Sequence, residues 1–143
     1  DFRWRKSQIK STSLLANVIY RTEAKKQKVF EVILQENGLI TEGAVSNVFC
    51  CLNNKIITPP LTENILPGVT RKVILDVIQN SSLEFEETNI SIDSIFSAEE
   101  IWITNSTKGI VPIVELDGKK VGSGIPGKKY FQISKAFLAK LSA

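Results

Sequence analysis

The stretch Ile40-Thr41-Glu42-Gly43-Ala44-Val45-Ser46-Asn47-Val48-Phe49 lies where two apolar runs meet. The runs cover residues 29–34 and 48–52. Runs of this length that are rich in β-branched residues are typical of buried strands. A hairpin turn is already supplied by Asn37-Gly38, a pair that suits a two-residue connection. The sequence therefore predicts that the polar part of this stretch leads into a second strand.

Three polar residues, Glu42, Ser46 and Asn47, stand at the start of this predicted strand. A buried carboxylate loses its hydration, so Glu42 would need a partner that offsets this loss. A solvated turn in which these side chains cap the backbone is the simpler alternative. This stretch by itself does not decide between a buried Glu42 and a solvated turn, so the decision depends on the rest of the chain.

The composition is that of one domain, large enough to bury a substantial core. The chain has 143 residues, of which 43% are hydrophobic and 23% charged, and its formal net charge is +3. The densest basic groups are Lys25-Lys26, Lys119-Lys120 and Lys128-Lys129, so the positive charge is scattered. Nucleic-acid binding calls for a basic stripe with exposed aromatic residues. We therefore expect no nucleic-acid partner.

The absence of histidine narrows the possible chemistry. Without it, the chain forms no Ser-His-Asp or Cys-His nucleophile system and no His-ligated metal site. Cys50 and Cys51 are adjacent, and neighbours in a strand point to opposite faces, so we expect reduced, apolar cysteines in a cytoplasmic protein. We also expect no metal. Any catalysis would use lysine, tyrosine, carboxylates, hydroxyls, backbone amides or a borrowed cofactor.

No part of the sequence has the pattern of a membrane span or a signal peptide. Neither an apolar run of about 18 residues nor a charged-then-apolar N-terminal segment occurs, so we expect no membrane partner. The chain contains no methionine, not even an initiator. We therefore expect it to be the later part of a longer protein.

The first predicted helix follows Ser11-Thr12-Ser13, whose hydroxyls are suited to cap it. It extends over roughly a dozen residues, and Leu14-Leu15 with Val18-Ile19 form its apolar face. Lys10 stands just before the helix N-terminus, where the positive helix end disfavours another positive charge. Partial burial there would favour the neutral amine, whereas an exposed lysine is the alternative.

The rest of the chain alternates predicted strands and helices. Residues 29–34, 48–52 and 55–58 are expected to form an antiparallel meander. The later predictions are a helix that opens at Gly68, an edge strand at 83–87, a helix at 91–98 capped by Ser91, a buried strand at 100–104, a strand at 110–116 with Pro112 at an edge or bulge, a hairpin turn at Asp117-Gly118 and a closing helix at 128–141.

Two further segments carry groups suited to bind an anion. Gly68-Val69-Thr70 opens a periodic helix, so its free N–H groups and hydroxyl form a candidate phosphate cradle, although ordinary helix starts have the same pattern. Asn105-Ser106-Thr107 follows a buried strand, and its hydroxyls and amides suit an oxyanion or phosphate. Lys10 and Glu42 lie in two other segments, so four separate segments carry polar or charged groups that could contact a ligand.

Together and in this order, the four segments resemble the C-terminal half of class IV, fold type IV pyridoxal-phosphate aminotransferases. The similar motifs span nearly the whole chain and are Ile9-Lys10-Ser11, Thr41-Glu42-Gly43 through Ser46-Asn47-Val48-Phe49, Ile65-Leu66-Pro67-Gly68-Val69-Thr70-Arg71, and Thr104-Asn105-Ser106-Thr107. The resemblance implies a mixed α/β (α+β) fold, with a largely antiparallel sheet or pseudo-barrel flanked by helices. It also implies that the whole chain is one cofactor-binding domain for pyridoxal 5′-phosphate.

The resemblance implies a role for each candidate residue. Lys10 would carry the Schiff base to the cofactor and act as general acid/base at the substrate's α-carbon. Glu42 would pair with the protonated pyridine nitrogen. Ser46 and Asn47 would orient this region or have a purely structural role, and Leu66 would pack against the ring face. The phosphate would be bound by Val69, Thr70, Ser106 and Thr107. Gly68 and Asn105 would also belong to the cofactor-binding residues, with no specific role assigned to Asn105.

The implied reaction is transamination between an amino acid and a 2-oxo acid, and the chain is most similar to the D-amino-acid transaminase group. Branched-chain aminotransferase and aminodeoxychorismate lyase are alternatives, as is a domain that keeps the fold without turnover. The presence of both Lys10 and Glu42 argues against the last. Family members carry a smaller N-terminal domain that these residues do not match. We therefore expect a preceding segment, in cis or as a companion chain, and the resemblance also implies a homodimer.

Overall fold

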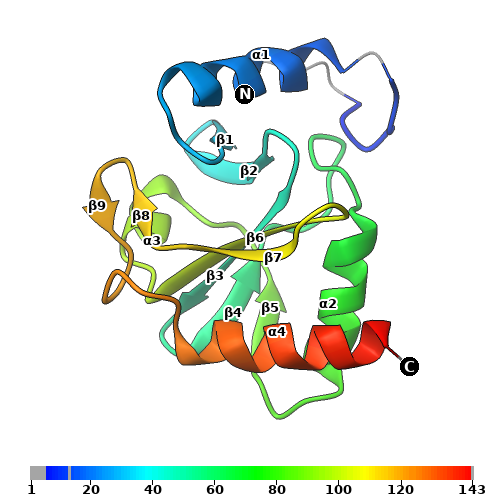
Figure 1. Cartoon of the computed structure of the whole chain (residues 1–143), viewed down its shortest axis with the longest axis vertical. Helices are drawn as coiled ribbons and strands as arrows, with labels where there is room; N and C mark the ends of the chain where they lie inside the picture. The colour runs from blue at the N-terminus through cyan, green and yellow to red at the C-terminus, as the bar shows by residue number, and fades with distance from the viewer. Residues whose placement is uncertain (1–5, 13, 143) are drawn as a thin grey trace.

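The computed structural model describes residues 6–12 and 14–142. Its helices are α1 (Leu15–Lys26), α2 (Val69–Gln79), α3 (Ile92–Phe96) and α4 (Lys128–Leu141). Its strands are β1 (Ile33–Glu36), β2 (Leu39–Gly43), β3 (Asn47–Leu52), β4 (Lys55–Thr58), β5 (Phe85–Glu87), β6 (Glu100–Asn105), β7 (Gly109–Ile113), β8 (Glu115–Leu116) and β9 (Lys119–Lys120). Figure 1 shows how these elements are arranged.

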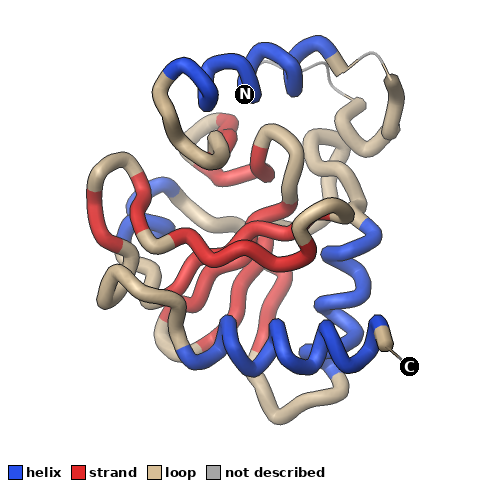
Figure 2. Tube along the Cα trace, in the orientation of Figure 1, coloured by secondary structure: helices blue, strands red, loops and turns tan. Residues whose placement is uncertain are grey.

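A five-stranded sheet forms the centre of the fold, with the strand order β5-β4-β3-β6-β7. Its neighbouring strands are antiparallel except for β4 and β5, which run parallel. The pairs β1-β2 and β8-β9 form two separate antiparallel sheets. Figure 2 shows helices around these strands, with α2 and α4 beside the five-stranded sheet. The predicted mixed, largely antiparallel sheet flanked by helices is therefore confirmed.

The central strands β3 and β6 are covered on both faces. On one face Phe49 stacks on Trp102 with ring centroids 6.0 Å apart, and both pack with Ile74 of α2 and Phe137 of α4. The opposite face, which includes Val48, packs against α3 and the β8-β9 hairpin. Because successive side chains of a strand point to opposite faces, the continuous apolar runs of these strands fill two cores.

The predicted single antiparallel meander is wrong, because its strands belong to two sheets. β1 begins at Ile33, later than predicted, and pairs with β2, whereas β3 pairs with β4 and β6. The Gly43 N–H donates to the Ser46 carbonyl at 2.7 Å, which closes a tight turn over residues 44–46. This turn directs the chain from one sheet to the other. Glu42 thus lies near the end of β2, and Asn47 begins β3.

Several local predictions are confirmed. The closing helix α4 has the predicted bounds, and Ser91 caps α3 by accepting a backbone hydrogen bond at 3.0 Å. Pro112 lies in β7 at an edge of the sheet, where its missing N–H is tolerated. Asp117 and Gly118 have φ values of 47° and 76°, as a two-residue hairpin turn requires. The predicted strand at 110–116 is instead two strands, β7 and β8, in different sheets.

Helix α1 has the predicted length of 12 residues but not the predicted cap. Leu14 is its N-cap residue and makes no side-chain capping bond, and Ser13 lies outside the described residues. The predicted apolar face is largely uncovered, with Leu15 and Val18 exposed to 71% and 60%. In Figure 1, α1 lies beside β1 and β2, away from α4. No helix in the described part of the chain combines the length and apolar composition that a membrane crossing needs.

Candidate functional site

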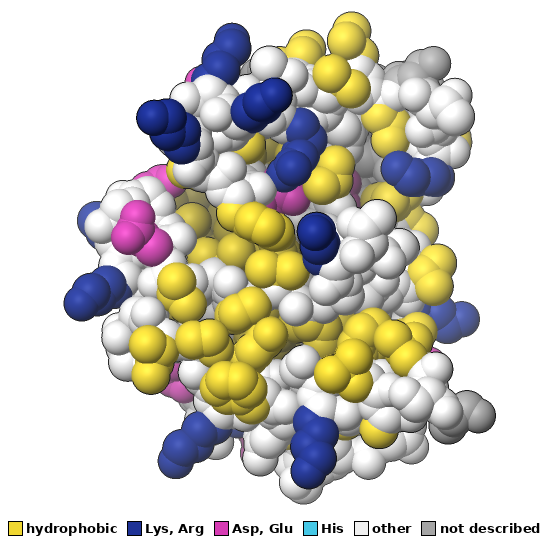
Figure 3. Space-filling view, viewed as in Figure 1, with side chains coloured by type: hydrophobic (Ala, Val, Ile, Leu, Met, Phe, Trp, Pro, Cys, Tyr) yellow, Lys and Arg dark blue, Asp and Glu magenta, His cyan; other side chains and the backbone are white. Residues whose placement is uncertain are grey.

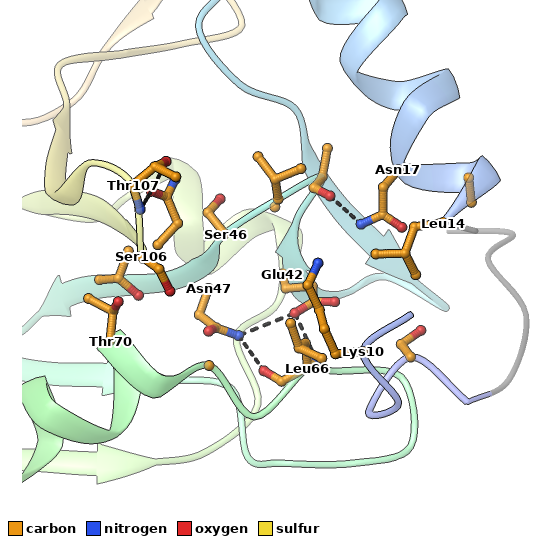
Figure 4. Close-up of a pocket in the computed structure, with 18 of the residues that line it drawn as sticks. Lys10, Leu14, Asn17, Glu42, Ser46, Asn47, Leu66, Thr70, Ser106 and Thr107 are labelled. Carbon is orange, nitrogen blue, oxygen red and sulfur yellow. Dashed lines mark hydrogen bonds between the residues drawn. The ribbon is translucent and has the colours of Figure 1, made fainter. Parts of the chain in front are cut away.

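One pocket gathers the residues that the sequence indicated. Its volume is about 870 Å³, and its walls come from the segment before α1, α1 itself, the β2–β3 turn, the start of α2 and the loop after β6. Figure 4 shows the pocket with its main side chains. The lining includes all of the candidate residues, which are Lys10, Glu42, Ser46, Asn47, Leu66, Gly68, Val69, Thr70, Asn105, Ser106 and Thr107. Segments far apart in the sequence therefore meet in one place.

Glu42 is a buried carboxylate in the wall of this pocket, with an exposure of 4%. Its Oε2 accepts hydrogen bonds from the Leu66 backbone N–H at 2.9 Å and from Asn47 Nδ2 at 3.2 Å. These donors offset part of the desolvation that burial of a carboxylate costs. The alternative of a solvated turn is therefore wrong for Glu42.

Asn47 connects this carboxylate to the segment before α2. Its Nδ2 also donates to the Leu66 carbonyl at 2.8 Å, so one amide group holds both Glu42 and Leu66, as the dashed lines in Figure 4 show. A Cβ added at Gly68 would collide with Asn47 Oδ1, so glycine allows this close approach. Asn47 therefore orients Glu42 relative to the start of α2.

The start of α2 offers backbone donors to the pocket. Gly68 is the N-cap residue and has no side chain to cap the helix, and the Lys72 N–H donates to its carbonyl at 3.0 Å. The N–H groups of Val69, Thr70 and Arg71 precede this bond and have no partner within the helix. No acidic residue lies in the first turn. This helix end is therefore suited to an anion, and Thr70 adds a hydroxyl.

The loop after β6 is shaped by Asn105. Its Oδ1 accepts from the Thr107 N–H at 3.1 Å, the Thr107 hydroxyl at 3.0 Å and the Lys108 N–H at 2.8 Å. Asn105 thus has a local role in holding the loop, and the Thr107 hydroxyl proton is engaged within it. Ser106 is exposed at the pocket, so its hydroxyl is accessible to a ligand.

Lys10 reaches the pocket from the segment that precedes α1 (Figure 4). Lys10 precedes the helix as predicted, although the N-cap residue is Leu14 rather than a residue of the predicted cap 11–13. Lys10 is also exposed, as the alternative for this residue predicted. Its exposure leaves the amine accessible to a ligand that enters the pocket.

Glu31 is a second buried carboxylate, which the sequence did not indicate. Its side chain is 3% exposed, its Oε2 accepts from the Ser46 hydroxyl at 3.1 Å, and its Oε1 lies 3.6 Å from Nη1 of Arg21 in α1. Asn17 of α1 donates to the Ala44 carbonyl. These contacts fasten α1 to the pocket wall and orient Ser46. No local sequence pattern identifies Glu31 as a site residue, because its apolar neighbours predict only a strand.

The chain is similar to known proteins of one family. The family model described as amino-transferase class IV matches residues 1–116. The chain belongs to this family. The resemblance found in the sequence is therefore confirmed, over most of the chain.

Curated relatives of the chain are D-alanine aminotransferases. It is 40% identical over 127 residues to the one from Bacillus licheniformis, which covers 89% of this chain and 45% of the relative. It is 34% identical over 137 residues to the one from Staphylococcus haemolyticus, which covers 96% of this chain and 49% of the relative. The chain thus spans about half the length of the curated relatives it matches.

Similar solved structures are branched-chain aminotransferases. The Escherichia coli branched-chain amino acid aminotransferase superposes with a TM-score of 0.84 at 32% identity, covering 87% of this chain and 42% of that one. The branched-chain aminotransferase from Thermoproteus uzoniensis gives a TM-score of 0.86 at 24% identity, covering 94% and 48%. This second similarity shows a shared fold.

Proposed function

We propose that the protein carries out pyridoxal-phosphate-dependent transamination between an amino acid and a 2-oxo acid, with D-amino acids as its substrates. The observation that carries the proposal is the meeting of Lys10, Glu42 and two segments suited to bind an anion in one pocket. The similarity to D-alanine aminotransferases supports the choice of D-amino acids.

The walls of the pocket fit the chemical groups of pyridoxal phosphate. The N–H groups and hydroxyl at the start of α2, together with Ser106, suit its phosphate. The buried carboxylate of Glu42 suits a protonated ring nitrogen, and Leu66 offers an apolar side chain to the ring face. The accessible amine of Lys10 suits the aldehyde. The phosphate, the ring nitrogen, the ring face and the aldehyde thus each have a matching residue in the same pocket.

The residues of the chain have distinct parts in the proposed reaction. When bound, the cofactor supplies a ring that withdraws electrons from the substrate's α-carbon. Lys10 would take the proton from this carbon at Nζ and deliver it to the carbon that was the cofactor's aldehyde, so that the amino group passes from the substrate to the cofactor. Glu42 would keep a proton at the ring nitrogen, and its hydrogen bonds to Asn47 and Leu66 hold the carboxylate in place.

Borohydride reduction of the protein with pyridoxal phosphate, followed by peptide mass spectrometry, tests the proposal. We expect a pyridoxyl group on Lys10, and no such group in the pocket of Lys10→Ala. Lys108→Ala is the matched control, because Lys108 is exposed in the loop after β6 and does not line the pocket. This control should be labelled like the wild type. Labelling spread over surface lysines and absent from Lys10 would contradict the proposal.

Transamination of branched-chain amino acids is a second candidate, favoured by the similarity to the Escherichia coli branched-chain enzyme. D-alanine and L-leucine are offered separately with 2-oxoglutarate, and the glutamate formed is analysed for chirality. D-glutamate from D-alanine supports the first function, whereas L-glutamate from L-leucine supports the second. If neither forms, conversion of aminodeoxychorismate to 4-aminobenzoate would indicate the lyase. These assays use the full-length protein, and the absence of all three activities would indicate a domain without turnover.

We also propose that turnover requires a further segment over the mouth of the pocket, in cis or as a companion chain. Leu15 and Val69 line the pocket and are exposed to 71% and 72%, and Ile19 and Val45 beside them are also exposed. We call these four residues the apolar rim. Grouped apolar side chains around a pocket are typical of a surface that another domain or chain covers. In a homodimer, a second copy would supply this cover.

A further inference from the structure

Thr104 is a buried pocket residue that neither the sequence pattern nor the proposed cofactor contacts assign. It lies in β6 directly before the Asn105 loop, lines the pocket and is 1% exposed. Its hydroxyl is one of two buried side-chain polar groups without a hydrogen-bond partner among the described residues. A buried hydroxyl without a partner is unfavourable. The structure therefore holds a donor next to the pocket that is ready to pair with something else.

The strand geometry shows where Thr104 points. Trp102, two positions earlier in β6, packs with Ile74 of α2, and side chains two apart lie on the same face of a strand. Across the strand pair Thr104 lies opposite Asn47, which in turn lies against Gly68 at the start of α2. The Thr104 side chain is therefore on the face of the sheet where α2 begins.

The start of α2 is also the part of the pocket suited to an anion. Its first N–H groups have no intrahelical partner, and no acidic side chain lies in its first turn. The unpaired hydroxyl of Thr104 is an independent sign of a ligand at the same place. The Thr104 hydroxyl is itself buried. A rotation of about 120° about χ1 would move it to the position now held by the methyl group or by the Cβ hydrogen, without moving β6.

We propose that Thr104 is a further phosphate-binding residue, whose hydroxyl donates a hydrogen bond to a phosphate oxygen of the bound cofactor. This assignment rests on the proposed function. The rival explanation is a buried water shared with Trp102 Nε1, the other buried polar group without a partner in the described part of the chain. That explanation gives the hydroxyl a structural role and no contact with the ligand.

Thr104→Val separates the two explanations, because valine keeps the shape and removes the hydroxyl. Dissociation constants are measured for pyridoxal phosphate and for pyridoxal, which lacks the phosphate, together with the Tm of the cofactor-free protein. We expect the Kd for pyridoxal phosphate to rise about tenfold, the Kd for pyridoxal to stay unchanged and the Tm not to fall. Thr104→Ser keeps the hydroxyl and should retain a Kd for pyridoxal phosphate close to that of the wild type.

An unchanged Kd for pyridoxal phosphate in Thr104→Val, or an equal rise for both ligands with a lower Tm, would overturn the assignment. Failure of the wild-type protein to bind pyridoxal phosphate would instead overturn the proposed function. In that case titration with inorganic phosphate decides the role of Thr104. If Thr104→Val binds phosphate more weakly than the wild type, Thr104 is an anion-binding residue. If both bind phosphate equally, the assignment of Thr104 is overturned.

Discussion

Among single residues, Glu42 carries the charge on which the proposed chemistry depends. Its carboxylate is held by Asn47 and by the Leu66 N–H. Glu42→Gln keeps the size of the side chain and removes its charge. We expect pyridoxal phosphate still to bind. In the full-length protein, kcat/KM for D-alanine with 2-oxoglutarate should fall on the order of 100-fold. Glu84→Gln, at an exposed position outside the pocket, is the control, and a rate unaffected by Glu42→Gln would refute the role at the ring nitrogen.

A second prediction at the scale of single residues concerns the reactivity of the two cysteines. Burial raises the pKa of Cys50 and that of Cys51 from 9.0 to about 12, and for Cys51 the adjacent Glu99 carboxylate adds to the effect. Both thiols therefore stay protonated at neutral pH. We expect iodoacetamide at about pH 8 to spare them in the folded protein and to alkylate both after unfolding in urea. Rapid labelling without denaturant would contradict their burial.

The same shift has a consequence for stability at high pH. An unfolded thiol loses its proton near 9.0, whereas the folded thiols hold theirs to about 12. Between these values the unfolded state binds fewer protons, so the free energy of unfolding falls as pH rises. Cys50→Ala should make the urea midpoint less sensitive to pH across this range.

The site residues differ in how far the sequence could reveal them. Lys10 and Glu42 were indicated by motifs at a characteristic spacing. Glu31 was not indicated, because it lies beside an apolar strand, and Thr104 belonged to a motif but was given no role of its own. Only the packing shows a hydroxyl contact for Glu31 and an unpaired hydroxyl for Thr104. Motifs mark groups that act on a ligand, whereas supporting contacts depend on neighbours brought together by the fold.

At the scale of elements, the junction of β3 with the start of α2 depends on Gly68. Its φ of −62° is accessible to any residue, so the requirement for glycine is steric. In Gly68→Ala the new Cβ meets Asn47 Oδ1. We expect a loss of about 1–3 kcal/mol in the free energy of unfolding, measured by urea titration, and weaker binding of pyridoxal phosphate.

A double variant checks this explanation. Asn47→Ala removes the atom that the new Cβ meets, so Gly68→Ala should cost clearly less in the Asn47→Ala background than in the wild type. Additive losses from the two substitutions would show that the collision does not cause the effect.

Elements with a strong local signal were predicted well. The amphipathic helix α4, the Ser91 cap and the Asp117-Gly118 turn all follow from residues close in sequence. The pairing of β1 with β2 and of β3 with β6 does not. Strand partners are chosen by the cores on both faces of the sheet, and a short turn such as residues 44–46 decides which sheet a strand joins.

At the scale of the whole molecule, apolar surface remains uncovered. Figure 3 shows hydrophobic side chains over α1 and in a band between β7 and α4. Of the possible covers for the apolar rim, a second copy of the chain can be tested directly. We expect the wild-type chain to self-associate in sedimentation equilibrium and Leu15→Lys to weaken this association about tenfold or more, since a buried unpaired charge is unfavourable.

Leu138→Lys is the matched control for this experiment. Leu138 is 59% exposed on α4 and does not line the pocket, so its substitution should leave the association unchanged. Equal effects of the two variants would show that the apolar rim is not the contact between copies. If the wild-type chain is monomeric at all concentrations, the apolar rim must be covered by a further domain or by a different companion chain.

The sequence by itself determined the family and many of the residues that line the pocket. Their types and spacing carry that information, and the family match and the pocket lining agree with it. The tertiary structure decided how Thr41-Glu42-Gly43 works: Glu42 lies near the end of β2, held by Asn47 from β3 and by the Leu66 N–H ahead of α2. The physical reason is that burial and hydrogen bonding of a carboxylate depend on segments distant in the chain, which only the packed fold brings together.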